Sequence, residues 1–288
     1  MGYHGLQFLR FAAKHAQFGR VATIGRQELG LDKKEIRRLI GAQYKDEKYC
    51  DSLLLQHFGA TCVDSWDYSD YEGAGHIADM NKPLNGKLSA YDTLIDFGSL
   101  EHVYNAPQAL LNVSELCRDG GQILHILPGN NFCGHGFWQF SPELFFSLYC
   151  ESNGYAETRV FLASEYRTDT WYEVMKPEHG QRANVISFTP TFVLCRTVKS
   201  RKCCHDSVQQ SDYIHAWQQQ NEATQPHVEA RPMWREKIRS ALQSSPLIDF
   251  AFFSYIKISG KWSLSARNPH LTTRSVSSLA NERPTTAA

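Results

Sequence analysis

The chain has 288 residues, of which 42% are hydrophobic and 21% charged, a composition that excludes a largely disordered protein and indicates a sizeable buried core. Thirty basic residues balance thirty acidic ones, which argues against a nucleic-acid groove built on overall positive charge. The longest apolar run, 247–258, contains Asp249 and Lys257 and is too short to span a bilayer, so we expect no stable membrane insertion.

The eight cysteines and the N-terminal residues bear on location. No C-x-x-C pair is present, and several cysteines fall in apolar patterns where a reduced thiol packs as a small hydrophobic group. The adjacent Cys203, Cys204 and His205 lack the spacing of a zinc site. Polar residues such as Arg10 and Lys14 interrupt the N-terminal apolar pattern, so no secretory signal is predicted and we expect a cytoplasmic protein.

The first part of the chain alternates strands and helices. We expect a helix over residues 5–16, then a strand over 20–24 that ends at Gly25. Helices over 33–43 and 49–58 follow, and then a strand over 59–67 and a shorter one over 77–79. This order is typical of an α/β fold.

Residues 91–105 form the segment around which the rest is organised. The apolar run 93–95 predicts a buried strand that ends in Asp96 and Gly98, and Glu101 and His102 follow at once. A helix over 107–117, a turn at 119–121 that ends it through glycine, and a strand over 122–127 complete a βαβ unit. Since open α/β sheets bind ligands beyond the carboxyl ends of their strands, we expect the functional site here.

The second half predicts the remaining sheet and an extension. Ser141 and Pro142 begin a helix over 142–152, and strands over 158–163 and 183–196 follow, the latter with Pro190, which suggests an edge or a bulge. Beyond residue 199 we expect helices over 211–220 and 232–243. The predicted organisation is an N-terminal helical segment (1–19), a Rossmann-like domain (20–199), a mainly helical C-terminal extension (200–267) and a flexible tail (268–288). The domain is expected to hold a doubly wound, mostly parallel sheet with helices on both faces.

Several motifs carry a family resemblance. The sequence D-T-L-I-D-F-G-S-L-E-H-V at 92–103, followed by a helix and D-G-G-Q-I-L-H-I-L-P at 119–128, resembles the fourth strand, next helix and fifth strand of class I S-adenosylmethionine-dependent methyltransferases. S-W-D-Y-S-D-Y-E-G-A at 65–74 and G-H-G-F-W-Q-F-S-P-E-L-F at 134–145 resemble a bacterial methyltransferase-like group. The resemblance covers about two thirds of the chain and implies S-adenosylmethionine as cofactor.

The resemblance also implies donor-binding residues. Asp67, at the end of the second strand, would accept hydrogen bonds from the donor's ribose, with Asp64 as a competitor for that role. Asp79 would accept one from the adenine amine. Phe97 and Gly98 would line the donor.

The first glycine turn departs from the family pattern. Gly25 is expected to let the backbone approach the donor, but the sequence T-I-G-R-Q-E-L-G replaces a G-x-G-x-G turn. Arg26 and Gln27 occupy the positions where glycines normally admit the methionine part. If both side chains fold away, a donor cavity remains; if they fill it, donor binding is lost.

Three residues are candidates for catalysis on the acceptor side. His102 is the first choice for a general base because an imidazole titrates near neutral pH, and His135, in a loop between two glycines, is the second. Glu101 would face the same side. The alternatives are structural: His102 capping the next helix, and the 130–140 loop packing its aromatic residues on the core. Glu101 and His102 alone are weak evidence for a metal, so no metal site is predicted.

The leading hypothesis is therefore a methyltransferase that modifies a small molecule or a glycan precursor, with a hydroxyl acceptor because histidine bases suit it. A methyltransferase-like binding or scaffold protein that has lost donor affinity is the alternative. An oxidoreductase that uses a dinucleotide is disfavoured, since the chain has no G-x-G-x-x-G motif.

Overall fold

The computed structural model describes residues 1–41, 48–84, 89–201, 203, 208–222 and 246–282, so the predicted helix over 232–243 lies outside the described residues. The strands are β1 (Gly19–Ile24), β2 (Ala60–Asp67), β3 (His76–Ile77), β4 (Tyr91–Phe97), β5 (Cys117–Asn130), β6 (Tyr155–Ser164), β7 (Thr170–Val174), β8 (Thr191–Lys199) and β9 (Leu271–Ser275). The helices are α1 (Tyr3–His15), α2 (Lys33–Ile40), α3 (Asp51–His57), α4 (Ala106–Leu116), α5 (Pro142–Leu148), α6 (Ser211–Glu222), α8 (Pro246–Ser259) and α9 (Val276–Leu279), with short 3-10 turns η1 (Leu100–His102) and η2 (Glu151–Asn153).

The strands form one sheet in the order β3-β2-β1-β4-β5-β8-β6-β7-β9. The first five are parallel, in the order of a doubly wound sheet. β8 runs antiparallel to both of its neighbours, β5 and β6, and β7 and β9 continue the antiparallel part. The predicted Rossmann-like α/β fold is confirmed.

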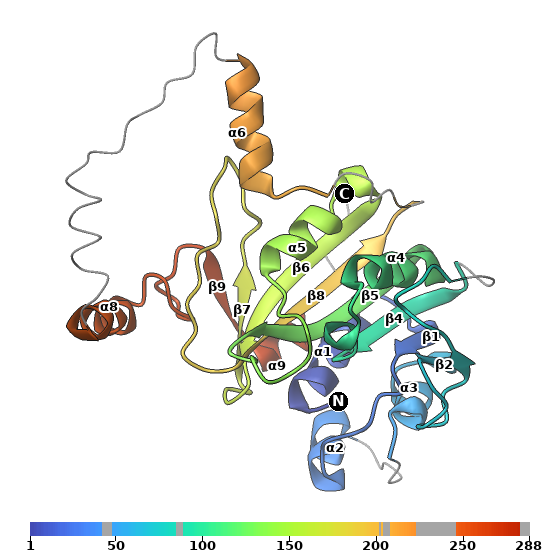
Figure 1. The fold of residues 1–288 in the computed structure, drawn as a ribbon. Helices are drawn as coiled ribbons and strands as arrows, with labels where there is room; N and C mark the ends of the chain where they lie inside the picture. The colour runs from blue at the N-terminus through green and yellow to red at the C-terminus, as the bar shows by residue number, and fades with distance from the viewer. Residues whose placement is uncertain (42–47, 85–88, 202, 204–207, 223–245, 283–288) are drawn as a thin grey trace.

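Helices cover both faces of the sheet, as predicted (Figure 1). On one face α4 and α5 bury residues such as Leu110, Val113 and Phe145 in one apolar cluster. On the other, α1, α3 and α9 contribute Phe8 and Leu53, among others, to a second cluster. The N-terminal helix therefore packs on the sheet as part of the same core, because its apolar positions recur at helical spacing.

Several predicted elements differ from the structure at their ends, and two of these regions show a clear local cause. The strand expected over 183–196 begins only at Thr191, and β8 is an interior strand, so Pro190 precedes the strand and marks neither an edge nor a bulge within it. The helix α4 ends at Leu116, before the glycines. Tyr91 pairs with Cys117 and Thr93 with Gln122, so the intervening residues loop out of β5 and use the positive φ of Gly120 there.

The prediction of a flexible tail from residue 268 is wrong for residues 271–279. Leu271–Ser275 forms β9, which pairs with β7, and Val276 and Leu279 of α9 are buried on the sheet. The segment looked like a frayed end because an outer strand exposes most of its side chains, leaving Ser, Thr and Arg to dominate its composition.

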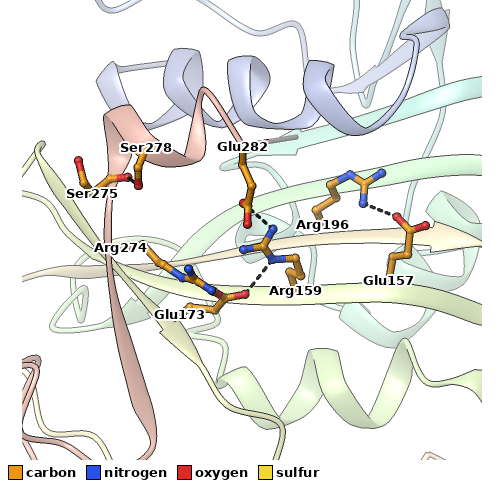
Figure 2. A network of polar contacts seen from close by, with 8 residues as sticks. All are labelled: Glu157, Arg159, Glu173, Arg196, Arg274, Ser275, Ser278 and Glu282. Atoms are coloured by element: carbon orange, nitrogen blue, oxygen red, sulfur yellow. Dashed lines mark hydrogen bonds and ion pairs between the residues drawn. The ribbon is translucent and has the colours of Figure 1, made fainter. Parts of the chain in front are cut away.

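Ion pairs attach this last strand, as Figure 2 shows. Glu173 of β7 accepts from the guanidinium Nε of Arg159 at 2.8 Å and from that of Arg274 of β9 at 2.7 Å. Arg159 also donates to Glu282 at 2.9 Å. Burial by itself would raise the pKa of Glu173, but its hydrogen bonds and charge contacts with the two arginines outweigh this and lower that pKa.

The remaining predicted extension contains α6 and α8. Several apolar side chains of α8 are exposed, including Phe250 and Ile258. Among the described helices, none combines the length and the hydropathy needed to cross a membrane.

We predict that Glu173→Gln lowers the free energy of unfolding at pH 7 by about 1–3 kcal/mol, because two charge-assisted hydrogen bonds are weakened. Since the pKa of Glu173 is lowered by folding, its contribution is complete above its ordinary value of 4.5 and is lost as the pH falls through the folded value. Urea unfolding of both proteins from pH 7 to 3 checks this: the difference should shrink below about pH 4.5.

Asp169→Asn is the matched control, because it makes the same chemical change at a side chain that is 78% exposed. It should change stability by less than about 0.5 kcal/mol. Equal effects of the two substitutions, or an effect of Glu173→Gln that grows on acidification, would contradict the assigned role of Glu173.

Candidate functional site

A cavity of about 470 Å³ lies beyond the carboxyl ends of β1, β2 and β4. This volume is in the range of small-molecule sites. The cavity wall includes six of the candidate site residues: Gly25, Asp67, Asp79, Phe97, Gly98 and His102. They come from four separate stretches of the chain, and the parallel strand order brings them together.

Gly25 makes a close turn at the end of β1. Its φ is +69°, and a Cβ at this position would lie 2.5 Å from the Ser99 hydroxyl oxygen. That hydroxyl donates to the carbonyl of Ile24 at 2.6 Å, which ties the turn after β4 to the end of β1. Glycine is therefore required here both for its conformation and for the contact.

Arg26 and Gln27 border the cavity without filling it. Arg26 donates to the Asp51 carboxylate and to the carbonyl of Glu72, both at 2.8 Å, and its guanidinium lies 4.1 Å from the centroid of the Tyr49 ring. The buried Gln27 amide donates to the carbonyl of Ile24 at 3.0 Å. Both side chains are thus held by their own partners, and the space between the glycine turns stays open.

The three aspartates differ in what they contact. Asp67 lines the cavity and accepts from the backbone amide of Tyr68 at 2.6 Å. Asp79 also lines it, but its carboxylate is already bonded by the Asn81 side-chain amide at 2.8 Å and by Lys82 at 3.2 Å. The hydrogen bonds from Asn81, followed by that from Lys82, hold the pKa of Asp79 below its ordinary value.

Asp64, the competitor for the ribose role, is not part of the cavity wall. It accepts a hydrogen bond from the Tyr91 hydroxyl at 3.0 Å and lies 3.9 Å from His76. Its position three residues before the end of β2 places it deeper in the sheet than Asp67. This leaves Asp67 as the better-placed acceptor.

A buried network lies beneath the cavity. The Asp96 carboxylate, 1% exposed, is bonded by His125 Nδ1 at 2.8 Å and by the backbone amides of Ser99 and Leu100 at 3.1 and 3.3 Å. His125 Nε2 in turn contacts the Tyr149 hydroxyl at 2.7 Å. Asp96 therefore positions the turn that carries Glu101 and His102.

Glu101, His102 and His135 lie together at one end of this turn. His135 Nε2 is 3.2 Å and His102 Nε2 is 3.7 Å from Glu101 Oε1. Burial, reinforced by the nearby Asp96 charge, raises the pKa of Glu101 to about 8. Burial and the neighbouring His135 lower the pKa of His102, so its imidazole is neutral at pH 7.

Hydrogen bonds to backbone carbonyls hold the loop that carries His135 against this turn. The amide of Phe137 donates to the carbonyl of Glu101 at 2.7 Å, and the indole of Trp138 donates to the carbonyl of Val103 at 2.9 Å. The aromatic residues of this loop pack only partly on the core: Phe140 is buried there, whereas Phe137 and Trp138 are exposed.

Part of the cavity wall, namely Trp66, Tyr68, Met80 and Asn81, was not predicted from the sequence. Trp66 and Tyr68 flank Asp67 in the S-W-D-Y motif, so the end of that strand already pointed to them. Met80 and Asn81 follow the two-residue strand β3, which is too short to show a clear pattern.

Known proteins resemble this chain in structure and not in sequence. No family model and no curated protein matches the sequence. The structure is similar to that of YcgJ from Bacillus subtilis, at 10% identity and a TM-score of 0.40, over 69% of this chain and 99% of that one. It is also similar to 1,6-didemethyltoxoflavin-N1-methyltransferase from Burkholderia thailandensis, solved with S-adenosylhomocysteine, at 14% identity and a TM-score of 0.37 over 68% and 79%.

A third similar structure is an S-adenosylmethionine-dependent methyltransferase from Mesorhizobium loti, at 16% identity and a TM-score of 0.29, over 44% of this chain and 56% of that one. Two of the three are methyltransferases, the class that the sequence resembles. At these identities and scores, no activity or substrate of this chain follows from them.

We predict that Gly25→Ala destabilises the protein more than Gly41→Ala does. Both positions have nearly the same φ, +69° and +68°, so both substitutions carry the cost of the left-handed conformation, about 1–2 kcal/mol. An alanine Cβ at 41 meets no described atom within 4 Å, whereas at 25 it meets Ser99. Urea unfolding should show an extra loss of about 1 kcal/mol or more for Gly25→Ala; equal losses would mean that Ser99 moves aside freely.

Proposed function

We propose that this chain is an S-adenosylmethionine-dependent methyltransferase that modifies a hydroxyl of a small molecule or a saccharide. The observation that carries this is the open cavity at the ends of β1, β2 and β4, which combines glycine turns with the carboxylate of Asp67. Ligand sites of doubly wound sheets occur at this position. The side chains of Arg26 and Gln27, which could have closed the cavity, are bonded elsewhere.

The residues present fit such a donor. Asp67 supplies a carboxylate for ribose hydroxyls, and the turns at Gly25 and Gly98 let a ligand approach the backbone, since both positions lack a Cβ. Met80 and Phe97 provide apolar surfaces against which the adenine ring of the donor can pack. Asp79 would accept from an exocyclic amine only through lone pairs not used by Asn81 and Lys82.

The donor, when bound, would supply an electrophilic methyl group on sulfur. The work of the protein is then to hold an acceptor oxygen in line with that group and to remove its proton. His102 lines the cavity, is half exposed and is neutral at pH 7, so it can accept a proton. His135, bonded to Glu101, is the second candidate base.

Calorimetric titration with S-adenosylmethionine and S-adenosylhomocysteine tests this function. We expect saturable binding to the wild type that weakens about tenfold to a hundredfold in Asp67→Asn, because one set of charge-assisted hydrogen bonds is weakened. Asp70→Asn is the matched control: Asp70 is exposed on the loop that follows Asp67 and lies outside the cavity wall.

Unchanged affinity in Asp67→Asn would contradict the assigned donor orientation. If the wild type does not bind the donor at millimolar concentration, the proposed methyltransferase activity is contradicted and a methyltransferase-like binding or scaffold protein is favoured. Binding that both substitutions weaken equally would point to a general charge effect on the loop.

A further inference from the structure

We infer that Glu101, His102 and His135 form a binding site for one divalent transition-metal ion at the edge of the cavity. These three residues are a carboxylate and two imidazoles whose ligand atoms all lie within 4.8 Å of one another. Sequence alone did not predict this site because His135 is more than thirty residues away from the other two.

The spacing suits a metal. Metal–nitrogen and metal–oxygen bonds of about 2.0–2.2 Å put neighbouring ligand atoms about 3–3.5 Å apart. Glu101 Oε1 is 3.2 Å from His135 Nε2 and 3.7 Å from His102 Nε2. Both imidazoles are half exposed, so rotation about their side-chain torsions can bring the three ligand atoms around one ion.

The carboxyl group gives an independent sign of a missing partner. The side chain of Glu101 is 1% exposed, and its Oε2 has no hydrogen-bond partner among the described residues. Buried carboxylate oxygens are normally paired with a donor or a cation. No arginine or lysine contacts this carboxyl in the described part of the chain, whereas two imidazoles do.

The backbone holds the ligands in place before any ion binds. His135 lies on a loop whose Phe137 amide donates to the carbonyl of Glu101, so the ligands of the loop and of η1 cannot drift apart independently. Gly136 makes this contact possible: its φ is +73°, and a Cβ there would lie 2.8 Å from the Glu101 carbonyl oxygen. Preorganisation of this kind reduces the ordering cost of binding.

The ligand set indicates the kind of ion. Two imidazoles and one carboxylate favour zinc, iron or cobalt over magnesium or calcium, which prefer oxygen ligands. His102 and His135 are 52% and 53% exposed, so an ion can enter and its remaining coordination positions stay open. In the proposed function, which this role assumes, an acceptor hydroxyl bound at an open position would have its pKa lowered by the ion.

Equilibrium dialysis of the purified, chelator-treated protein against Co²⁺ and Zn²⁺ tests the site. We expect one ion per chain, with visible absorption bands in the cobalt form. His102→Ala and His135→Ala should each weaken binding at least tenfold. His179→Ala is the control, because it removes an exposed imidazole outside the cluster and should leave the affinity unchanged.

Gly136→Ala separates positioning from ligation. It keeps all three ligands but forces the loop away from Glu101, so we expect metal affinity to fall at least tenfold while circular dichroism shows the fold retained. Failure of the wild type to take up one ion, or equal uptake by wild type and His135→Ala, would overturn the inference.

These measurements use no methyl donor, so the two proposals fail separately. Metal uptake without donor binding would leave the metal site standing and remove the methyltransferase function. Donor binding without metal uptake would remove the metal site and leave the methyltransferase function standing, with His102 as a candidate base.

Discussion

The buried carboxylate of Asp96 is the constraint on which the site depends. It lies at the end of β4 and is bonded by His125 of β5 and by the amides of Ser99 and Leu100. An unpaired carboxylate at this depth would cost several kcal/mol, so these partners must stay in place while the protein is folded. The end of the central strand, its neighbour and the following turn are thereby held in one arrangement.

The turn after β4 contributes both to the cavity and to the cluster of Glu101, His102 and His135. Phe97, Gly98 and Ser99 face the cavity, and two residues later Glu101 meets His135 from the loop after β5. His102 belongs to both, since it lines the cavity and neighbours Glu101. Transfer between two bound molecules needs such proximity, because the reacting atoms must be held within a few ångströms.

The strands of the parallel half of the sheet could be predicted from the sequence, whereas only some strands of the antiparallel half could. The strand at 91–97 has an apolar centre, Leu94 and Ile95, and is followed by Gly98, while the strand at 60–67 is preceded by Gly59; these signals are local in the sequence. β9 was missed because an edge strand with exposed side chains resembles a polar loop in composition, and β7 was missed because its five residues are too few to show a clear pattern. Their place is decided by contacts distant in sequence, such as the bond of Arg274 to Glu173.

By itself the sequence determined the α/β class and the expected strand-end position of the site, because strands and turns follow local patterns. The residues Gly25, Asp67, Asp79, Phe97, Gly98 and His102, which the family resemblance and the residue chemistry had singled out, line the cavity. Only the tertiary structure decided that Arg26 and Gln27 leave the cavity open, since their partners Asp51 and Ile24 are chosen by packing. It also brought His135 to Glu101, a contact across 34 residues that no local periodicity encodes.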